Sequence, residues 1–193
     1  MTLPNLITLA RIAAVPLIVW FIVMGRLTPA FVVFLAAGVS DAIDGFLARR
    51  FKMRSELGAW LDPIADKALL VSIYVTLGMM LHLEQWLVIL VVSRDIAIVV
   101  FVLLAYLMGR KMPMAPSKIS KVNTAAQIAL AGLVLASLGL SFDAAEAIEI
   151  GAIIVGATTA TSGLHYLIQW LKVMTESENG KPGPGTRGSG GQG

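Results

Sequence analysis

The chain has 193 residues, of which 57% are hydrophobic and 14% charged. A soluble domain carries roughly a quarter charged residues, so this composition argues against an ordinary water-soluble protein. The chain contains no cysteine, which excludes disulfide scaffolds and thiolate metal sites. The net charge of +3 is modest, and we expect no nucleic acid as a partner.

Six apolar stretches follow one another along the chain, each near the roughly 20 residues that a membrane-spanning helix needs. Hydrocarbon satisfies no unpaired backbone group, and the alternating pattern of a barrel strand is missing, so we expect helices. The expected spans lie at about 4–25, 29–49, 58–81, 85–109, 123–141 and 146–172. The predicted fold is therefore an all-α integral membrane protein, a bundle of six transmembrane helices.

The first stretch differs from a cleavable signal peptide. Arg11 interrupts its apolar run, residues 1–5 contain no basic side chain, and no small-residue cleavage site follows. We therefore expect a retained helix. The pattern of a transit peptide is also missing, which favours a bacterial inner membrane over a mitochondrial one.

Lysine and arginine are distributed unevenly over the expected connections, and the positive-inside rule places the richer side in the cytoplasm. That side holds Arg49, Arg50, Lys52, Arg54, Arg110, Lys111, Lys118, Lys121, Lys172, Lys181 and Arg187. The other side holds one base with four acids, namely Arg26, Glu84, Asp143, Glu146 and Glu149. Both termini are therefore expected to be cytoplasmic, in agreement with an even number of helices.

The C-terminal residues have a different composition. Residues 180–193 contain seven glycines and two prolines with almost no apolar side chain, so this segment cannot pack. We expect a membrane domain over residues 1–175 and a disordered Gly-rich cytoplasmic tail over residues 176–193.

Four aspartates lie in or at the ends of the second and third expected spans. Asp41 and Asp44 are three residues apart, and Asp62 and Asp66 are four apart. Each pair therefore shares one face of its helix. If the connection turns near Met53, antiparallel packing brings both pairs together below the cytoplasmic surface. A carboxylate inside a membrane is costly unless it faces a polar cavity and finds a partner, so a functional site is expected here.

Carboxylates that cluster in this way repel one another unless a cation lies between them. Hard oxygen ligands suit Mg²⁺ or Mn²⁺, and two such ions are a recurrent device for displacement at phosphorus. Gly45 and Gly58 leave room beside the acids for a backbone or a diphosphate. The alternative is that the glycines serve helix packing while the acids form a proton or cation relay. The spacing alone leaves both interpretations open.

The same residues form a long motif. Asp41-x-x-Asp44-Gly45-x-x-Ala48-Arg49 is followed, after eight residues, by Gly58-x-x-x-Asp62-x-x-x-Asp66. This pattern resembles the signature of the CDP-alcohol phosphatidyltransferases, which carry it in the second and third of six helices. The resemblance implies that the four aspartates bind two divalent ions at the diphosphate of a CDP-linked lipid. It also implies that Asp66 is the general base, and that the CDP-lipid is held by Gly45, Ala48, Arg49 and Gly58.

Three basic residues concern the acceptor. Arg94 lies mid-way along the fourth span, and its guanidinium matches phosphate oxygens bidentately, so we expect it to bind an acceptor phosphate. The alternative is mutual neutralisation with Asp95, although neighbouring helical residues do not face each other well. Lys118 and Lys121 start the fifth helix and either bind the same phosphate or only set the topology.

Other expectations concern the first, third and sixth helices. Asn5 and Thr8 share roughly one helix face, where they either contact the nucleotide or anchor the helix at the interface. Lys67, next to Asp66, either neutralises the acids or extends to the interface. Gly151 and Gly156 allow close helix contact, including contact between protomers. The resemblance also suggests a homodimer.

Within the family, secondary stretches are most similar to cardiolipin synthases that use CDP-diacylglycerol. These stretches are Ser93-Arg94-Asp95-Ile96, residues 116–127 and Thr158-Thr159-Ala160. The expected reaction transfers a phosphatidyl group from CDP-diacylglycerol to phosphatidylglycerol, giving cardiolipin and CMP. The close alternative is a phosphatidylglycerophosphate synthase with glycerol 3-phosphate as the acceptor. Alternatives outside the family are an ion-coupled transporter and a structural membrane scaffold.

Overall fold

The computed structural model describes the backbone of residues 3–51, 56–107 and 118–178, and side chains over residues 10, 12–40, 67–101, 104, 119–171 and 175. The described residues form six α-helices, which confirms the expected all-helical chain. They are α1 (Leu3–Val23), α2 (Leu27–Phe51), α3 (Glu56–Met79), α4 (Gln85–Leu107), α5 (Lys118–Leu140) and α6 (Ala145–Glu178).

Helix α6 is longer than the sequence analysis expected. It continues to Glu178, past the expected end of the span at 172 and into the segment assigned to the tail. Residues 173–178 contain neither glycine nor proline, so nothing local stops the helix before Gly180. Residues 179–193, the rest of the expected tail, lie outside the described residues.

Two of the described helices have the length and composition of membrane spans. Within the described part of the chain, Ile119–Leu140 and Ala145–Leu171 are long and apolar enough to cross a bilayer. Shorter apolar helical segments are Ile12–Val23, Leu27–Ser40 and Lys67–Met79. That all six helices cross a membrane, and that both termini are cytoplasmic, stays a prediction.

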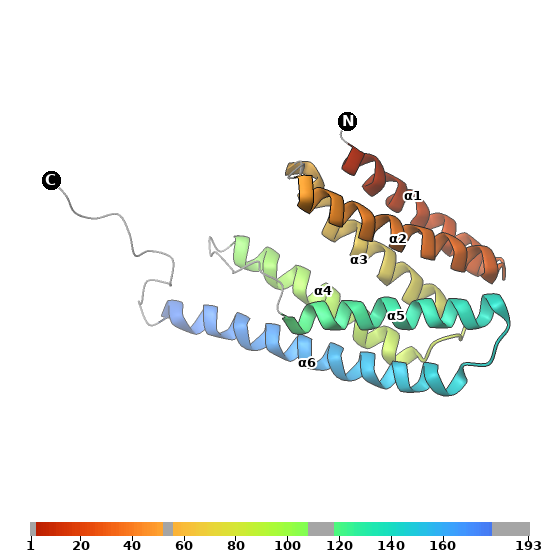
Figure 1. Cartoon of the computed structure of the whole chain (residues 1–193). Helices are drawn as coiled ribbons and strands as arrows, with labels where there is room; N and C mark the ends of the chain where they lie inside the picture. Colours follow the sequence, from red (N-terminus) through yellow and green to blue (C-terminus); the bar gives the residue numbers. More distant parts are fainter. Residues whose placement is uncertain (1–2, 52–55, 108–117, 179–193) are drawn as a thin grey trace.

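The helices run back and forth between two ends of a bundle, so that α1 begins and α6 ends at the same end (Figure 1). Helix α1 packs against α2 and α3, while α5 packs against α2 and α6. Helix α4 packs against α3 and α6. Helices α4 and α5 therefore connect the group α1–α3 to α6.

The apolar core fills the bundle between these helices. Large side chains with essentially no exposure include Ile18, Ile73, Tyr74, Leu87 and Leu135. Helices α2 and α6 bury Phe34 and Val155 in this core, while Val39 of α2 and Ile153 of α6 are exposed. On α4, Leu87 is buried and Ile89 is exposed. Helices that are apolar on both their inner and outer faces fit a bundle surrounded by lipid better than one surrounded by water.

At one end of the bundle, three helices are each followed by a residue in the left-handed backbone region. Gly25 follows α1 with a φ of 69°, Leu81 follows α3 with 59°, and Ser141 follows α5 with 57°. Such residues close the last turn, because the following amide reaches back to a helix carbonyl. The amide of Arg26 donates to Phe21 O at 2.8 Å, and the amide of His82 to Leu77 O at 2.9 Å.

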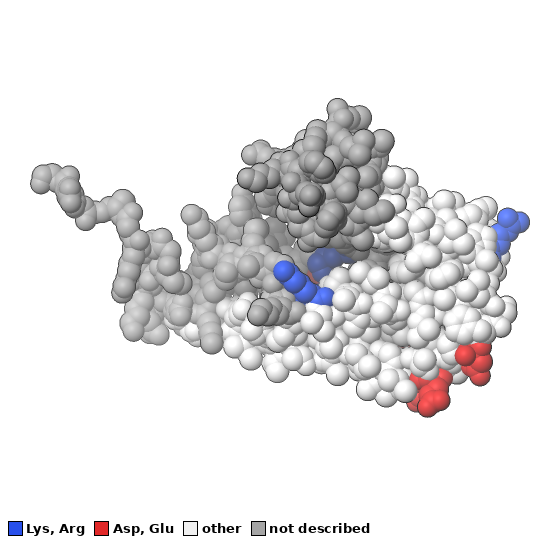
Figure 2. Space-filling view, in the orientation of Figure 1, with Lys and Arg blue, Asp and Glu red and all other residues white. Residues whose placement is uncertain are grey.

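The connections expected to be poor in bases lie at one end of the bundle. Of the bases expected on the other side, Lys121 alone has a described side chain, so the charge asymmetry stays a prediction. Arg26, Glu84, Asp143, Glu146 and Glu149 lie in or next to the connections that follow α1, α3 and α5. Figure 2 shows acidic side chains at this end, and basic side chains in a recess near the middle of the molecule.

Candidate active site

The four aspartates lie on the two helices that flank one short connection. Asp41 and Asp44 belong to the second half of α2, and Asp62 and Asp66 to the first half of α3. Both segments are helical, as the spacing argument requires. Asp41 and Asp66 each lie ten residues from the helix end that borders residues 52–55. Asp41 and Asp66 are therefore equally far along their helices from the connection between α2 and α3.

The side chains expected to bind metal and CDP-lipid lie outside the described residues. This holds for Asp41, Asp44, Ala48, Arg49, Asp62, Asp66, Asn5 and Thr8. Among the side chains that are described, no group of three or more His, Cys, Asp or Glu residues is placed to hold a metal ion. The donor set of the motif consists of carboxylates alone, which is the chemistry that fits Mg²⁺ or Mn²⁺.

Arg94 and Asp95, adjacent on α4, form a buried ion pair. Arg94 Nη1 lies 2.5 Å from Asp95 Oδ1, and the residues are 6% and 5% exposed. The neutralisation that the sequence analysis kept as an alternative is therefore present. The long, flexible side chain of Arg94 reaches the carboxylate of its neighbour Asp95. Whether Arg94 also binds an acceptor phosphate stays a prediction.

Lys67 is the second cation at Asp95. Its Nζ atom lies 2.9 Å from Asp95 Oδ1, and its side chain is 37% exposed. The sequence analysis left two roles for Lys67, and in the structure it contacts an acid of α4. The sequence shows an acid within an apolar span at position 95, but whether Lys67 contacts it depends on which helices pack together.

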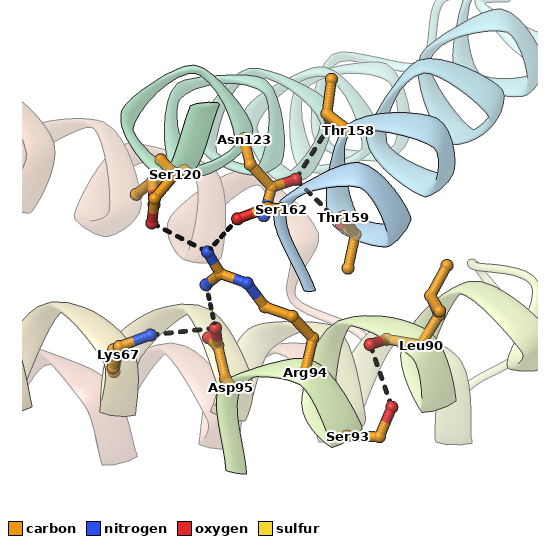
Figure 3. Close-up of polar contacts among 11 residues, drawn as sticks. Lys67, Leu90, Ser93, Arg94, Asp95, Ser120, Asn123, Thr158, Thr159 and Ser162 are labelled. Atoms are coloured by element: carbon orange, nitrogen blue, oxygen red, sulfur yellow. Dashed lines mark hydrogen bonds and ion pairs between the residues drawn. The ribbon is translucent and has the colours of Figure 1, made fainter. Parts of the chain in front are cut away.

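The guanidinium of Arg94 also contacts α5 and α6. Nη2 donates to Ser120 Oγ at 2.8 Å and to Ser162 Oγ at 2.6 Å. The guanidinium carbon lies 5.7 Å from the ring centroid of Tyr166, within the range of a cation–π contact. Figure 3 shows the side chain of Arg94 reaching from α4 to hydroxyls on both neighbouring helices.

A second group of polar contacts, centred on Asn123, lies next to the contacts of Arg94 (Figure 3). The sequence analysis did not predict it. Asn123 on α5 is fully buried, and its Oδ1 accepts from Thr158 Oγ1 at 2.9 Å and Thr159 Oγ1 at 2.8 Å. One turn further along α5, the carbonyl of Gln127 accepts from Tyr74 Oη at 3.1 Å. Buried polar side chains in apolar helices were the available signal, because polar groups buried there need partners.

Some buried donors have spare capacity. Within the described part of the chain, Arg94 Nε, Asn123 Nδ2 and Gln127 Nε2 have no hydrogen-bond partner. A buried donor left unpaired costs about 1–3 kcal/mol. A polar molecule that reached these atoms would remove this cost.

The lysines expected at the acceptor lie at the start of α5. Lys118 is the first residue of the helix, and its side chain lies outside the described residues. Lys121 is exposed and directly follows Ser120, whose hydroxyl accepts from Arg94. The structure thus brings Lys121 and Arg94 to the same region without a contact between them among the described interactions.

The glycines of α6 serve contacts inside one chain. A Cβ built on Gly151 would lie 3.0 Å from Leu130 Cδ1, and one built on Gly156 would lie 2.9 Å from ring carbons of Trp86. Both contacts are with other helices of the same bundle. The expected contact between protomers stays a prediction.

Comparison with known proteins gives consistent matches. A family model described as CDP-alcohol phosphatidyltransferase matches residues 1–174. A cardiolipin synthase (CMP-forming)/mitochondrial hydrolase fusion protein of Schizosaccharomyces pombe is 35% identical over 86% of this chain and 31% of its own length. The cardiolipin synthase (CMP-forming) of Homo sapiens is 32% identical over 86% of this chain and 60% of its own.

A relative with another acceptor in its name also matches. The CDP-diacylglycerol--glycerol-3-phosphate 3-phosphatidyltransferase 2 of Arabidopsis thaliana is 33% identical over 81% of this chain and 73% of its own. This chain thus spans between about a third and three-quarters of the length of these three relatives.

Proposed function

The chain belongs to the CDP-alcohol phosphatidyltransferase family, and we propose on this basis that it is a membrane enzyme of phospholipid biosynthesis. The proposed reaction transfers the phosphatidyl group of CDP-diacylglycerol to a hydroxyl of phosphatidylglycerol, giving cardiolipin and CMP. The observation that carries the proposal is the complete aspartate motif on α2 and α3, within the region that the family model matches.

The metal site of this proposal consists of Asp41, Asp44, Asp62 and Asp66. When bound, Mg²⁺ or Mn²⁺ would neutralise the diphosphate and the charge that develops on the departing CMP. The four carboxylates would hold the metal ions within an otherwise apolar part of α2 and α3. Gly45, Ala48, Arg49 and Gly58, with Asn5 and Thr8 of α1, are the residues proposed to bind the CDP-lipid.

Asp66 is the proposed general base. The acceptor hydroxyl must lose its proton as its oxygen bonds to phosphorus, and a carboxylate beside the reacting atoms can take that proton. The bond from phosphorus to the bridging oxygen of CDP breaks in the same displacement, and CMP leaves with the electron pair. Asp66 lies one helical turn beyond Asp62, further from the connection between α2 and α3.

Arg94, Lys118 and Lys121 are proposed to bind the phosphate of the acceptor. The unpaired Nε of Arg94 among the described residues supports this proposal, as does the position of Lys121 next to Ser120, a partner of Arg94.

Phosphatidylglycerol is the first candidate for the acceptor, because two of the relatives reported above are named as cardiolipin synthases. The phosphodiester of phosphatidylglycerol carries a single negative charge, whereas a phosphomonoester such as glycerol 3-phosphate carries about −1.5 to −2 at pH 7. The second candidate remains glycerol 3-phosphate, because the Arabidopsis relative named for that acceptor matches at a similar identity. The lysines at the start of α5 supply the additional positive charge that this acceptor needs.

The proposed setting is a membrane, with all six helices as spans and the aspartates near the cytoplasmic side. The basic connections expected from the sequence support this orientation. A bacterial inner membrane and a homodimer are part of the same proposal. The membrane-length apolar helices α5 and α6 support the membrane setting.

The test is an assay of the purified protein in mixed micelles. Labelled CDP-diacylglycerol and Mg²⁺ or Mn²⁺ are supplied with phosphatidylglycerol in one reaction and glycerol 3-phosphate in another. We expect release of CMP with phosphatidylglycerol and a product with the mass of cardiolipin. Release with glycerol 3-phosphate alone would select the second candidate. No release of CMP with either acceptor would contradict the proposed transferase.

A further inference from the structure

Asp95 is a buried carboxylate that two cations share. Its Oδ1 atom lies 2.5 Å from Arg94 Nη1 and 2.9 Å from Lys67 Nζ. Arg94 alone balances the charge of this carboxylate. A buried ion pair adds little net stability, because desolvation of the charges offsets their attraction. The contact with Lys67 therefore needs an explanation other than charge balance or stability.

The contact between Lys67 and Asp95 joins α3 to α4 at the turn of α3 that contains Asp66. Lys67 directly follows Asp66 on α3, and Asp95 lies on α4. From Asp95 the network continues through Arg94 to Ser120 of α5 and Ser162 of α6. Figure 3 shows these side chains converging from the four helices. Lys67 thus connects the turn of α3 that follows Asp66 to the other half of the bundle, and further along α3 Tyr74 Oη donates to the carbonyl of Gln127 on α5 at 3.1 Å.

A second close contact between the same helices lies far away along α3. A Cβ built on Gly78 would lie 2.7 Å from Val88 Cγ2, so α3 and α4 approach closely near the turn that joins them. Lys67 and Gly78 are eleven residues apart, which is about 16 Å along an α-helix. The apolar core holds the second half of α3 through Ile73, Tyr74 and Leu77. The contact of Lys67 with Asp95 adds a polar tie to α4 at the turn next to Asp66.

We propose that Asp95 is a positioning residue: through Lys67 it fixes the turn of α3 that carries Asp62 and Asp66. This inference rests on the proposed function, because it assigns Asp95 a role in holding the acids of that reaction. It adds a residue outside the aspartate motif and outside the proposed acceptor contacts. Groups that hold metal ligands in place typically contribute about 10–100-fold to metal affinity or activity.

The first variant is Lys67→Met. The side chain of Lys67 is 37% exposed, and its removal leaves the pair of Arg94 and Asp95 intact, so the variant should fold. We expect kcat to fall roughly 10–100-fold, with the KM of the acceptor unchanged. The affinity for Mn²⁺, measured by electron paramagnetic resonance of the free ion without substrate, falls by a similar factor. Lys67→Arg keeps the ion pair and restores most of both quantities.

The second variant is Asp95→Asn, alone and combined with Lys67→Met. If the two residues act through one contact, the double variant has nearly the kcat and Mn²⁺ affinity of the more impaired single variant. Independent roles give a product of the two losses instead. Glu149→Gln, an exposed acid near the start of α6, is the matched control and should behave as the original protein.

The outcomes separate this inference from the proposed function. Full kcat and full Mn²⁺ affinity in Lys67→Met would overturn the positioning role while the transferase stands. If the original protein releases no CMP, the proposed function fails, and the Mn²⁺ affinities of the variants still decide the role of Asp95. If the original protein binds no Mn²⁺, both fail.

Discussion

The indole ring of Trp86 on α4 fills the space beside Gly156 on α6, where a Cβ atom would lie 2.9 Å from Cη2 and Cζ3 of the ring. We predict that Gly156→Ala destabilises the protein. Alanine favours the helix by about 0.5–1 kcal/mol, but overpacking a close contact costs about 1–3 kcal/mol. The net effect is a loss, seen as a Tm lower by about 2–4 °C for each kcal/mol in a chain of this size.

Gly163→Ala is the matched control for this prediction. Its Cβ would lie 3.6 Å from Arg94 Cγ, an ordinary van der Waals distance. We expect an unchanged or slightly higher Tm, because only the gain in helix propensity remains. Equal Tm values for the two alanine variants would contradict the close packing of α4 on α6.

Asn123 connects α5 to α6, and we predict that its two threonine partners are energetically coupled to it. Asn123→Leu leaves the buried hydroxyl of Thr159 without its acceptor, which costs about 1–3 kcal/mol. Thr159→Val removes the other partner. The double variant should be more stable than the sum of the two losses predicts, with a coupling of about 0.5–3 kcal/mol. Unfolding in detergent, followed by circular dichroism, measures this coupling, and strict additivity would contradict the contact.

The positions of the helices could be predicted from the sequence, but several contacts between them could not. Apolar runs of membrane length are a local signal, and they located the helices that contain Asp41 and Asp66. The partners of Lys67 and Asn123 depend on which helices pack and how each is rotated. That information is non-local, so the sequence showed polar residues at 67 and 123 without showing that α4 and α6 supply their partners.

The contact between Arg94 and Asp95 is another that spacing along one helix did not predict. Helical geometry disfavours contact between adjacent side chains, yet these two are 2.5 Å apart. The long side chain of Arg94 reaches Asp95 with Nη1 while Nη2 donates to Ser120 and Ser162 of the neighbouring helices. The expectation from spacing considered one helix alone, whereas neighbouring helices set the rotamers.

Removal of metal should abolish activity reversibly. We predict that a chelator stops CMP release, because the proposed carboxylate site then lacks the charge that stabilises the diphosphate. Added Mg²⁺ or Mn²⁺ restores the rate. Ca²⁺ restores little, because its larger radius and its need for six to eight oxygen ligands suit a different site. Full CMP release in the presence of excess chelator would contradict the metal site.

Lys121 should act on the acceptor alone. We predict that Lys121→Ala raises the KM of phosphatidylglycerol several-fold, while kcat and the KM of CDP-diacylglycerol stay the same. An exposed cation lost from a phosphate site costs about 1 kcal/mol, which corresponds to roughly fivefold. Arg26→Ala, which removes a cation at the opposite end of the bundle, is the control. Equal KM values in both variants would assign Lys121 to topology only.

Asp66 should be required for chemistry more than for binding. We predict that Asp66→Asn lowers kcat by about 10²–10⁴-fold, because the amide cannot accept the proton of the acceptor hydroxyl. Asparagine keeps one oxygen as a ligand and nearly the same volume, so binding of CDP-diacylglycerol should remain largely intact. Release of CMP measures the first quantity, and equilibrium binding of labelled CDP-diacylglycerol measures the second. If binding is lost together with turnover, Asp66 is an essential metal ligand rather than the base, and another group must accept the proton.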